Sequence, residues 1–307
     1  MEDLVEKLGK LATEKRNPDS KDIDLLDTKG VLTLINNEDS KVAAIVRSKL
    51  DEITALTDLY VETIKNGGHI YYAGCGTSGR LAFVDAAEVS VTYGTDPSVV
   101  VAMMGGGLPA IKTPVEGLED RDEIGRQDCI ENNIQPQDLI IGVAASGRTP
   151  YVVGALKYGK EIGCKTGSIS CVENAYLSTL ADRAVELPTG PEVVLGSTRM
   201  KAGLATKMAL NMISSAAMIR LGHTFSNFLI DGIETTEKGH ARVIRQIMEI
   251  TGCDKERAVS AYQKTNRNFK VATLMVFANC DQQKASELLA EHENSLKKTL
   301  IALNIKY

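Results

Sequence analysis

The stretch that decides the fold of this 307-residue chain reads His69-Ile70-Tyr71-Tyr72-Ala73-Gly74-Cys75-Gly76-Thr77-Ser78-Gly79-Arg80. Its apolar first half is typical of a buried strand, and a helical pattern begins after Gly79. Glycines let the backbone turn sharply and approach a ligand, and the free N–H groups at a helix start attract anions. The stretch therefore favours a phosphate-binding turn between a strand and a helix. An ordinary strand-to-helix turn is the alternative.

The glycine spacing of this turn must be distinguished from two nucleotide-binding motifs. Gly74, Gly76 and Gly79 match the dinucleotide fingerprint, which needs an acidic residue at the end of the next strand. The next apolar run, 99–103, leads into Met104-Gly105-Gly106 and supplies no acid. A Walker loop needs Gly-Lys followed by Ser or Thr, and that sequence does not follow here. Neither nucleotide motif is therefore predicted.

Short apolar runs alternate with helical patterns through the middle of the chain. The runs predict strands at 70–73, 99–103, 139–144, 166–170 and 184–187. The patterns between them predict helices at 79–88, 119–132, 149–162 and 175–182. Strands separated by helices are typical of a parallel sheet covered on both faces. We therefore expect an α/β fold with a doubly wound, parallel, five-stranded sheet.

The segments on either side of this sheet have their own patterns. Residues 1–14 have helical spacing, and the polar residues 15–39 indicate a mostly irregular arm. A long amphipathic helix is expected over 42–64, and an almost wholly apolar one over 200–221. The helices expected after Gly222 are 237–250, 254–265, 269–278, 282–292 and 295–303. The predicted domains are an N-terminal helix and arm (1–40), the sheet domain (41–225) and a small all-helical C-terminal domain (226–307).

Composition and charge indicate which kinds of binding partner the protein does not have. The net charge of −5 argues against nucleic acid. No apolar run is long enough to cross a bilayer, and the charged N-terminus is unlike a signal peptide. The six cysteines and four histidines lack metal-ligand spacing, which favours reduced thiols and no metal. The sequence thus predicts a cytoplasmic protein without membrane or nucleic-acid partners.

Two further loops offer hydroxyl groups next to a predicted helix. Ala145-Ser146-Gly147-Arg148-Thr149-Pro150 follows the strand at 139–144. The loop at 190–201 precedes the apolar helix and adds Ser197, Thr198 and cationic side chains. In an open parallel sheet, ligands bind at the carboxyl ends of the strands. We therefore expect these loops to form a binding site with the turn after Gly74.

These motifs carry a family resemblance. Gly-x-Gly-Thr-Ser at 74–78, Ser-Gly-x-Thr-Pro at 146–150 and Gly-Pro-Glu…Ser-Thr at 190–198 resemble the sugar isomerase (SIS) domain, a flavodoxin-like phosphosugar-binding fold. More narrowly, the chain resembles the N-acetylmuramic acid 6-phosphate etherase family over nearly its whole length. The segments that carry this resemblance are Ile35–Asp39, Ala73–Arg80, Asp85–Glu88, Val115–Asp120, Ala144–Tyr151, Gly190–Gly203, Leu210–Met212 and Thr236–Lys238.

The resemblance implies an enzyme, a carbon–oxygen lyase that cleaves the D-lactyl ether of N-acetylmuramic acid 6-phosphate. The products would be N-acetylglucosamine 6-phosphate and (R)-lactate, in amino-sugar and cell-wall recycling. An alkyl ether leaves poorly, so the sugar ring must open and the ether must be eliminated across C2–C3 before water adds. This chemistry needs two proton-transfer groups and no metal or cofactor.

The resemblance also implies roles for particular residues. Glu88 would protonate the leaving oxygen, and Glu119 would abstract the C2 proton, although the reverse assignment stays open. Burial beside Val84 and Val89 would keep Glu88 protonated, whereas surface positions for both glutamates are the alternative. The phosphate ligands would be Thr77, Ser78, Ser146, Gly147, Thr149, Ser197 and Thr198, and the candidates for ring opening or an auxiliary role are His240 and Glu192.

Other functions and the assembly stay open. An aldose–ketose phosphosugar isomerase would need Glu119 but not Glu88, and a non-catalytic sugar-phosphate regulator would bind without turnover. Because single SIS domains usually complete their site with a second chain, the resemblance implies a homodimer with a shared site. Its contact surfaces would be the helices at 42–64 and 200–221. The chain departs from the family pattern around Glu88, which leaves the exact sugar substituent open.

Overall fold

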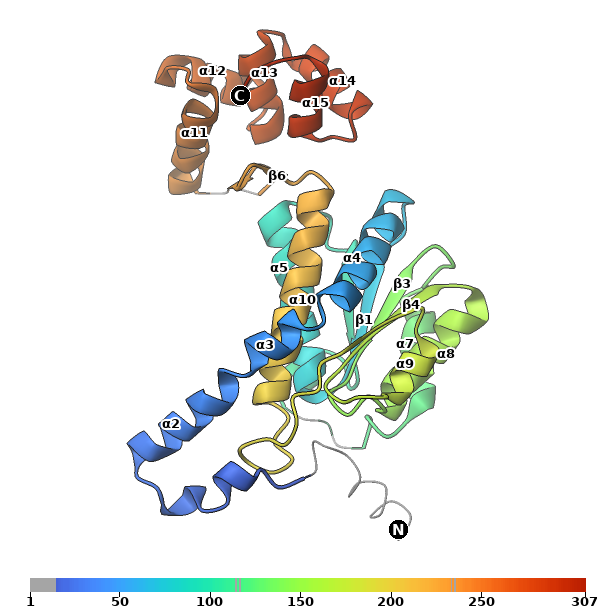
Figure 1. The fold of residues 1–307 in the computed structure, drawn as a ribbon. Helices are drawn as coiled ribbons and strands as arrows, with labels where there is room; N and C mark the ends of the chain where they lie inside the picture. The colour runs from blue at the N-terminus through green and yellow to red at the C-terminus, as the bar shows by residue number, and fades with distance from the viewer. Residues whose placement is uncertain (1–14, 114, 116, 233, 235) are drawn as a thin grey trace. The chain divides into compact units, whose positions relative to one another are not determined.

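The computed structural model describes residues 15–113, 115, 117–232, 234 and 236–307. Within them, parallel strands form one sheet in the order β2-β1-β3-β4-β5 (Figure 1). The strands are β1 (Ile70–Gly74), β2 (Val100–Met104), β3 (Leu139–Val143), β4 (Lys165–Ser170) and β5 (Arg183–Glu186). Each lies within one residue of its predicted bounds. The predicted doubly wound, flavodoxin-like sheet is therefore confirmed.

Helices cover both faces of this sheet (Figure 1). One face carries α4 (Leu50–Lys65), α5 (Gly76–Tyr93) and α10 (Lys201–Arg220), and the other carries α7 (Asp122–Glu131), α8 (Pro150–Ile162) and α9 (Tyr176–Leu180). Every residue of β1 and β3 is buried, as expected for central strands covered on both faces. Side chains alternate between the faces, so Tyr72 reaches Asp85 on α5 while Tyr71 joins the core under α8. The short helix α6 (Pro109–Lys112) follows β2.

Two predictions for the N-terminal region were wrong. The arm is mostly helical rather than mostly irregular, because it contains the short helices η2 (Pro18–Ser20) and η3 (Ile23–Leu25) and the helix α2 (Thr28–Asp39). The side chain of Asp27 accepts a hydrogen bond from the Gly30 amide and begins α2. The single helix expected over 42–64 is broken into α3 (Val42–Arg47) and α4. The helix predicted over 1–14 lies outside the described residues.

The helix break has a local cause. The hydroxyl of Ser48 donates a 2.7 Å hydrogen bond back to the carbonyl of Ile45 and so competes with the helical pattern. Lys49 then leaves the helical backbone region, with φ −115° and ψ 20°. The apolar spacing continues across this break, which is why the sequence pattern did not reveal it.

The chain divides into two compact units, and the division falls within α5 and α10. The first unit holds the sheet and comprises the described residues of Met1–Ala87 and Pro97–Ser215. The second comprises Glu88–Asp96 and Ala216–Tyr307. Within the described part of the chain, no helix is both long and apolar enough to cross a bilayer.

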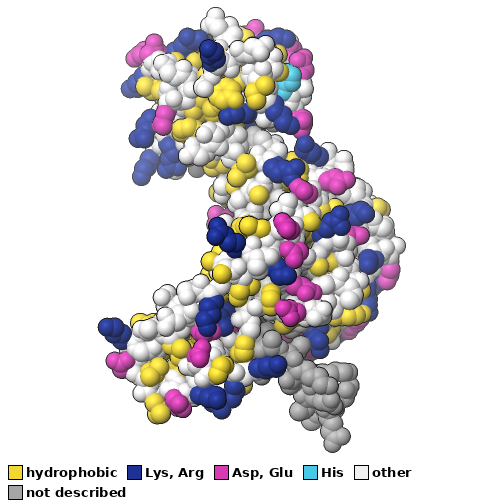
Figure 2. Space-filling model, viewed as in Figure 1, with side chains coloured by type: hydrophobic (Ala, Val, Ile, Leu, Met, Phe, Trp, Pro, Cys, Tyr) yellow, Lys and Arg dark blue, Asp and Glu magenta, His cyan; other side chains and the backbone are white. Residues whose placement is uncertain are grey.

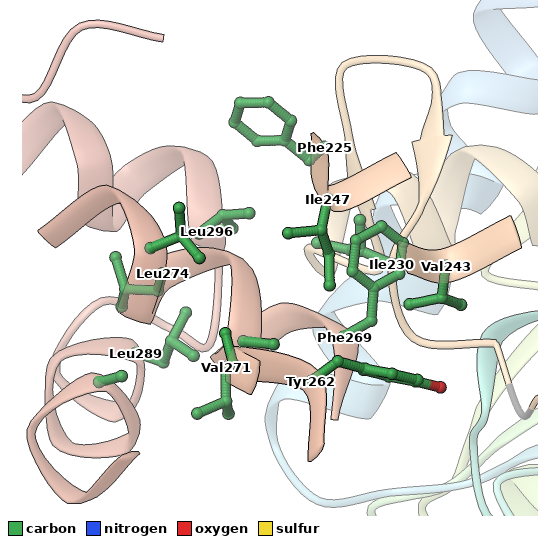
Figure 3. Packing of buried hydrophobic residues seen from close by; sticks show 14 of the residues in the cluster. Phe225, Ile230, Val243, Ile247, Tyr262, Phe269, Val271, Leu274, Leu289 and Leu296 are labelled. Carbon is green, nitrogen blue, oxygen red and sulfur yellow. The ribbon is translucent and has the colours of Figure 1, made fainter. Parts of the chain in front are cut away.

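The second unit has its own hydrophobic core (Figure 3), which includes Ile247, Phe269 and Leu296. Its elements are the hairpin of β6 (Thr224–Phe225) and β7 (Phe228–Leu229), followed by α11 (Glu237–Thr251), α12 (Lys255–Lys264), α13 (Phe269–Ala278), α14 (Gln282–Glu291) and α15 (Leu296–Ala302). Asp254 and Asp281 cap α12 and α14 through their side chains. The predicted C-terminal helices are confirmed, whereas the short hairpin was not predicted.

Candidate functional site

The three predicted loops are the turn between β1 and α5, the loop between β3 and α8, and the loop before α10. Because the strands are parallel, the ends of β1 and β3 lie at the same edge. The turn after β1 leads directly into α5, whose first turn contains Thr77 and Ser78. The amide of Gly105, which follows β2, donates a 3.1 Å hydrogen bond to the carbonyl of Gly74. The structure therefore places the predicted anion site at a helix start on this edge.

The loop before α8 requires glycine at position 147. Its φ of +65° lies in the left-handed region, and a Cβ there would lie 2.5 Å from the Cβ of Ala175. The hydroxyls of Ser146 and Thr149 are 3.4 Å apart on either side of this glycine. Two predicted phosphate ligands are thus brought together, while Arg148 is exposed to solvent.

The loop before α10 approaches the start of α5. A Cβ on Gly203 would lie 3.5 Å from Cγ2 of Thr77, so α10 and α5 pack closely at their first turns. Between them and α2 lies an open cleft of about 500 Å³, whose lining includes Thr77, Arg199 and Lys207. Ser197 and Thr198 are half-buried in the loop that precedes this contact. The structure therefore brings the first and third predicted loops together.

Glu192 has a position that the sequence did not predict. Its side chain is 0 % exposed, and its two carboxylate oxygens accept hydrogen bonds from the amides of Lys201 (3.0 Å) and Ala202 (2.9 Å). Burial raises the pKa of Glu192, although these amides act in the opposite direction. Glu192 therefore caps α10. A buried cap of this kind depends on a tertiary contact that sequence spacing does not show.

Glu119 lies close to the first two loops. Its carbonyl oxygen accepts a 3.1 Å hydrogen bond from the amide of Tyr151 in the first turn of α8. Glu119 also lines a cavity of about 100 Å³ together with Cys75, Gly76 and Arg80 at the start of α5. An acidic residue is thus placed beside the turn that is predicted to bind an anion.

Two residues of this cavity, Arg80 and Cys75, were not among the predicted site residues. The guanidinium of Arg80 donates hydrogen bonds to the carbonyls of Ala110 (2.8 Å) and Ile111 (2.9 Å), and so fixes the segment after β2. Burial, reinforced by the negative charge of Glu119, raises the pKa of the Cys75 thiol to about 12. Cys75 is therefore protonated at neutral pH and unsuited to act as a nucleophile. In the sequence, the position of Arg80 at the end of the Gly-rich stretch 74–80 could have indicated that it lies at this cavity.

The burial expected for Glu88 was wrong for this chain. Glu88 is exposed, and Val84, one turn earlier on the same face of α5, is 46 % exposed. Val89 is buried because it lies on a different face. Glu88 belongs to the second compact unit and Glu119 to the first. Their predicted pairing across one substrate stays a prediction.

His240 lies in α11 of the second unit with both ring nitrogens paired. The guanidinium of Arg267 lies 2.7 Å from Nε2, and the hydroxyl of Tyr262 lies 3.1 Å from Nδ1. Because a guanidinium only donates, Nε2 must accept, which assigns the proton to Nδ1. His240 is therefore half-buried, and its ring orientation is fixed by Arg267 and Tyr262. Among the described residues, no group of His, Cys, Asp or Glu side chains could hold a metal ion.

The fold has relatives among known protein domains. The model of the glucokinase regulatory protein N-terminal SIS domain matches residues 52–160, and that of the SIS domain matches residues 122–216. A solved phosphoheptose isomerase from Francisella tularensis is 14% identical with a TM-score of 0.47, over 64% of this chain and 100% of that chain. The domain matches and the observed sheet define a SIS-domain protein.

Relatives that match nearly the whole chain identify a particular family of SIS-domain proteins. The N-acetylmuramic acid 6-phosphate etherase of Geobacillus thermodenitrificans is 44% identical over 293 residues, which are 95% of this chain and 99% of that protein. The enzyme of the same name from Actinobacillus pleuropneumoniae is 40% identical over 298 residues, 97% of this chain and 98% of that protein. This chain belongs to the N-acetylmuramic acid 6-phosphate etherase family, which confirms the resemblance of its motifs.

Proposed function

We propose that the protein is a lyase that converts N-acetylmuramic acid 6-phosphate into N-acetylglucosamine 6-phosphate and (R)-lactate. The full-length relatives carry the name of this activity. The structural observation that carries the proposal is the position of Glu119, which lines the cavity at the start of α5 and is bonded to the start of α8. A proton acceptor therefore lies beside the loops expected to hold the phosphate.

The phosphate of the substrate binds to the loops at the carboxyl edge of the sheet. Its ligands are the hydroxyls and amides of Thr77, Ser78, Ser146, Gly147 and Thr149, with Ser197 and Thr198 contributing from the loop before α10. The 3.4 Å separation of the Ser146 and Thr149 hydroxyls suits two donors to one anion. The N-terminus of α5 adds its free N–H groups and its dipole.

The reaction proceeds by elimination followed by addition. Opening of the sugar ring exposes a C1 aldehyde, which makes the C2 proton acidic. Glu119 removes that proton, the C3–O bond breaks with its electron pair leaving on the lactyl oxygen, and Glu88 protonates that oxygen. Water then adds its oxygen to C3 while C2 regains a proton. His240 and Glu192 are assigned auxiliary roles, and Glu192 acts by capping α10.

A second copy of the chain completes the site. Glu88 is exposed in one chain, and the apolar side chains one turn to either side on its face of α5, Val84 and Val91, are 46 % and 66 % exposed. Leu25 and Leu32 are exposed on the arm, where Figure 2 shows hydrophobic side chains among charged ones. Covering such apolar surface favours association. We therefore propose a homodimer in which Glu88 is desolvated by the partner.

The cellular setting follows from the substrate and the cysteines. All six cysteines are free thiols, which suits a reducing compartment. We propose that the enzyme is cytoplasmic and acts in amino-sugar and cell-wall recycling, with the phosphosugar as its small-molecule partner.

The test is an assay of (R)-lactate release from N-acetylmuramic acid 6-phosphate. Wild-type protein should release lactate, whereas Glu119→Gln and Glu88→Gln should each lose at least about a hundredfold in kcat, because general acid–base groups contribute about 10²–10⁴. Glu123→Gln is the matched control, since Glu123 is exposed, pairs with Arg121 and lies outside the cavity.

The products decide between the three candidate functions. A ketose phosphate formed without lactate would identify an aldose–ketose isomerase, which should tolerate Glu88→Gln. Binding of the sugar phosphate without turnover would identify a regulator. Unchanged lactate release by either glutamate variant would remove that residue from the mechanism.

A further inference from the structure

A buried ion pair joins the N-terminal arm (residues 15–39) to the first residue of α10. Oε2 of Glu38 lies 2.5 Å from Nζ of Lys201, and the two side chains are 3 % and 4 % exposed. Glu38 is near the end of α2, so the pair links two helices that are far apart in the sequence. Neither charge has bulk water to solvate it, and each therefore depends on the other.

Glu38 has two further partners within or next to the arm. The ammonium of Lys41 donates to its Oε1, and the amide of Asn17 donates to Oε2 over 2.9 Å. Burial alone would raise the pKa of Glu38, but the hydrogen bonds from Lys201 and Lys41 lower it below its usual value. Glu38 is therefore an ionised anchor on which three donors converge.

The same arm holds the loop that precedes α10. The hydroxyl of Ser20 donates a 2.8 Å hydrogen bond to the carbonyl of Val193, and the amide of Asn17 lies 3.5 Å from the carbonyl of Pro191. Figure 1 shows the arm and this loop side by side. The loop from Gly190 to Met200 is therefore tethered to the arm near its beginning and, through Lys201, just after its end.

Ser197 and Thr198 lie between these tethers. The loop around them is built from local turns, with the Ser197 amide bonded to the Val194 carbonyl and the Met200 amide bonded to the Ser197 carbonyl. Such turns fix the shape of the loop but not its position on the sheet. Its position depends on the Glu192 cap, the Lys201 ion pair and the arm.

We propose that the arm is a positioning element of the substrate site: Glu38, Lys201 and Ser20 hold the Gly190–Met200 loop so that Ser197 and Thr198 reach the phosphosugar. This inference rests on the proposed function, because it takes Ser197 and Thr198 as substrate ligands. Glu38, Lys201 and Ser20 are positioning residues, since they act through the loop. Their loss should weaken sugar-phosphate binding and leave proton transfer at Glu119 intact.

The test measures binding and turnover separately in Ser20→Ala and Glu38→Gln. Titration calorimetry with N-acetylglucosamine 6-phosphate should show an increase in Kd of about tenfold for each variant, which corresponds to ~1.4 kcal/mol. Lactate release at saturating N-acetylmuramic acid 6-phosphate should stay within about twofold of wild type, so that KM rises while kcat is kept. A residue needed only for folding would lower the active fraction, and hence kcat, without changing Kd.

The matched controls make the same substitutions away from the buried Glu38–Lys201 pair. Ser40→Ala removes an exposed hydroxyl that donates to the Asn37 carbonyl, and Glu52→Gln breaks the half-buried pair with Lys49. Both should leave Kd unchanged. If Glu38→Gln does not fold, Ser20→Ala decides the outcome, since it removes only the buried hydrogen bonds of one hydroxyl and leaves the ion pair.

A folded Ser20→Ala variant with wild-type Kd and KM would overturn the inference. Wild-type protein that binds no N-acetylglucosamine 6-phosphate would also overturn it, because there would be no affinity for the arm to support. The binding measurement needs no turnover. Wild-type protein that binds the sugar phosphate but releases no lactate would therefore count against the proposed function alone.

Discussion

The amide of Tyr151 donates a 3.1 Å hydrogen bond to the carbonyl oxygen of Glu119. This bond joins the proposed base to the first turn of α8, the helix that follows the Ser146–Thr149 hydroxyls. The first turn of α8 packs directly against the backbone of α7 at Gly125. A Cβ on Gly125 would lie 1.8 Å from the carbonyl oxygen of Tyr151. The position of Glu119 thus depends on the backbone contact between α7 and α8.

Gly154→Ala should therefore destabilise the protein. A Cβ at Gly154 would lie 1.8 Å from the carbonyl oxygen of Asp122, so α7 must move away from α8. Overpacking of this kind costs about 1–3 kcal/mol in the free energy of unfolding, which urea denaturation measures. Gly203→Ala is the matched helical control, because its Cβ would have ordinary contacts at 3.5 Å. Equal stability of the two variants would contradict the proposed backbone contact.

Gly147→Ala should weaken sugar-phosphate binding. The substitution adds strain at φ +65° and a clash with Ala175, which would displace Ser146 and Thr149. We expect Kd for N-acetylglucosamine 6-phosphate to rise by at least about tenfold. Gly163→Ala is the control for backbone strain alone. Gly163 has φ +82° at the end of α8, but a Cβ there would meet no neighbouring atom. Gly147→Ala with unchanged affinity would argue against this loop as a phosphate site.

Cys75 should be dispensable for turnover although it lines the Glu119 cavity. Burial raises the pKa of its thiol to about 12, so it carries no thiolate at neutral pH. Cys75→Ser should release lactate at a rate close to wild type. In the folded protein, iodoacetamide should modify Cys75 at pH 8 far more slowly than after denaturation, as peptide mass spectrometry can measure. Complete loss of turnover in a folded, substrate-binding Cys75→Ser variant would contradict this assignment.

Asp85 should make stability depend on pH. It is 3 % exposed, accepts 3.0 Å hydrogen bonds from Tyr72 and Ser214, and has its pKa raised by burial from 3.8 to about 6. The folded carboxyl therefore keeps its proton over a range in which the unfolded one has lost it. The free energy of unfolding should fall by up to about 3 kcal/mol as the pH rises from about 4 to above 6.

Comparison with Asp85→Asn isolates this contribution. The stability of the variant relative to wild type should increase over the same pH interval, because the variant has no buried carboxyl to ionise. Asp24→Asn, at an exposed position on the arm, should follow the wild-type pH profile. Parallel profiles for wild type and Asp85→Asn would show that Asp85 does not ionise in that interval.

The sheet could be predicted from the sequence because its strands are short, apolar and separated by turn residues. Such runs as 70–74 and 139–143 are buried on both faces, and burial on both faces leaves a continuous apolar pattern. The helix α2 was missed because its polar composition concealed it, although Asp27 is a good N-cap. The break at Ser48 was missed because a side-chain hydrogen bond, rather than the apolar spacing, ends α3.

The site could be predicted only as far as local motifs describe it. Gly147 and the Ser146–Thr149 pair follow from a loop motif, and in the structure Gly147 has a positive φ and the two hydroxyls lie 3.4 Å apart. The capping role of Glu192 depends on its approach to α10, which is a tertiary contact. The exposure of Glu88 depends on what packs against its face of α5, and the sequence pattern of one helix does not contain that information.

The most direct test of the proposed elimination is turnover of N-acetylmuramic acid 6-phosphate in D₂O. If Glu119 removes the C2 proton, wild-type protein should release (R)-lactate, and the N-acetylglucosamine 6-phosphate formed should carry one deuterium at C2 by mass spectrometry and NMR. Glu119→Gln should form neither product at a comparable rate. Lactate release with the original hydrogen retained at C2 would contradict elimination across C2–C3 and the role of Glu119 as base.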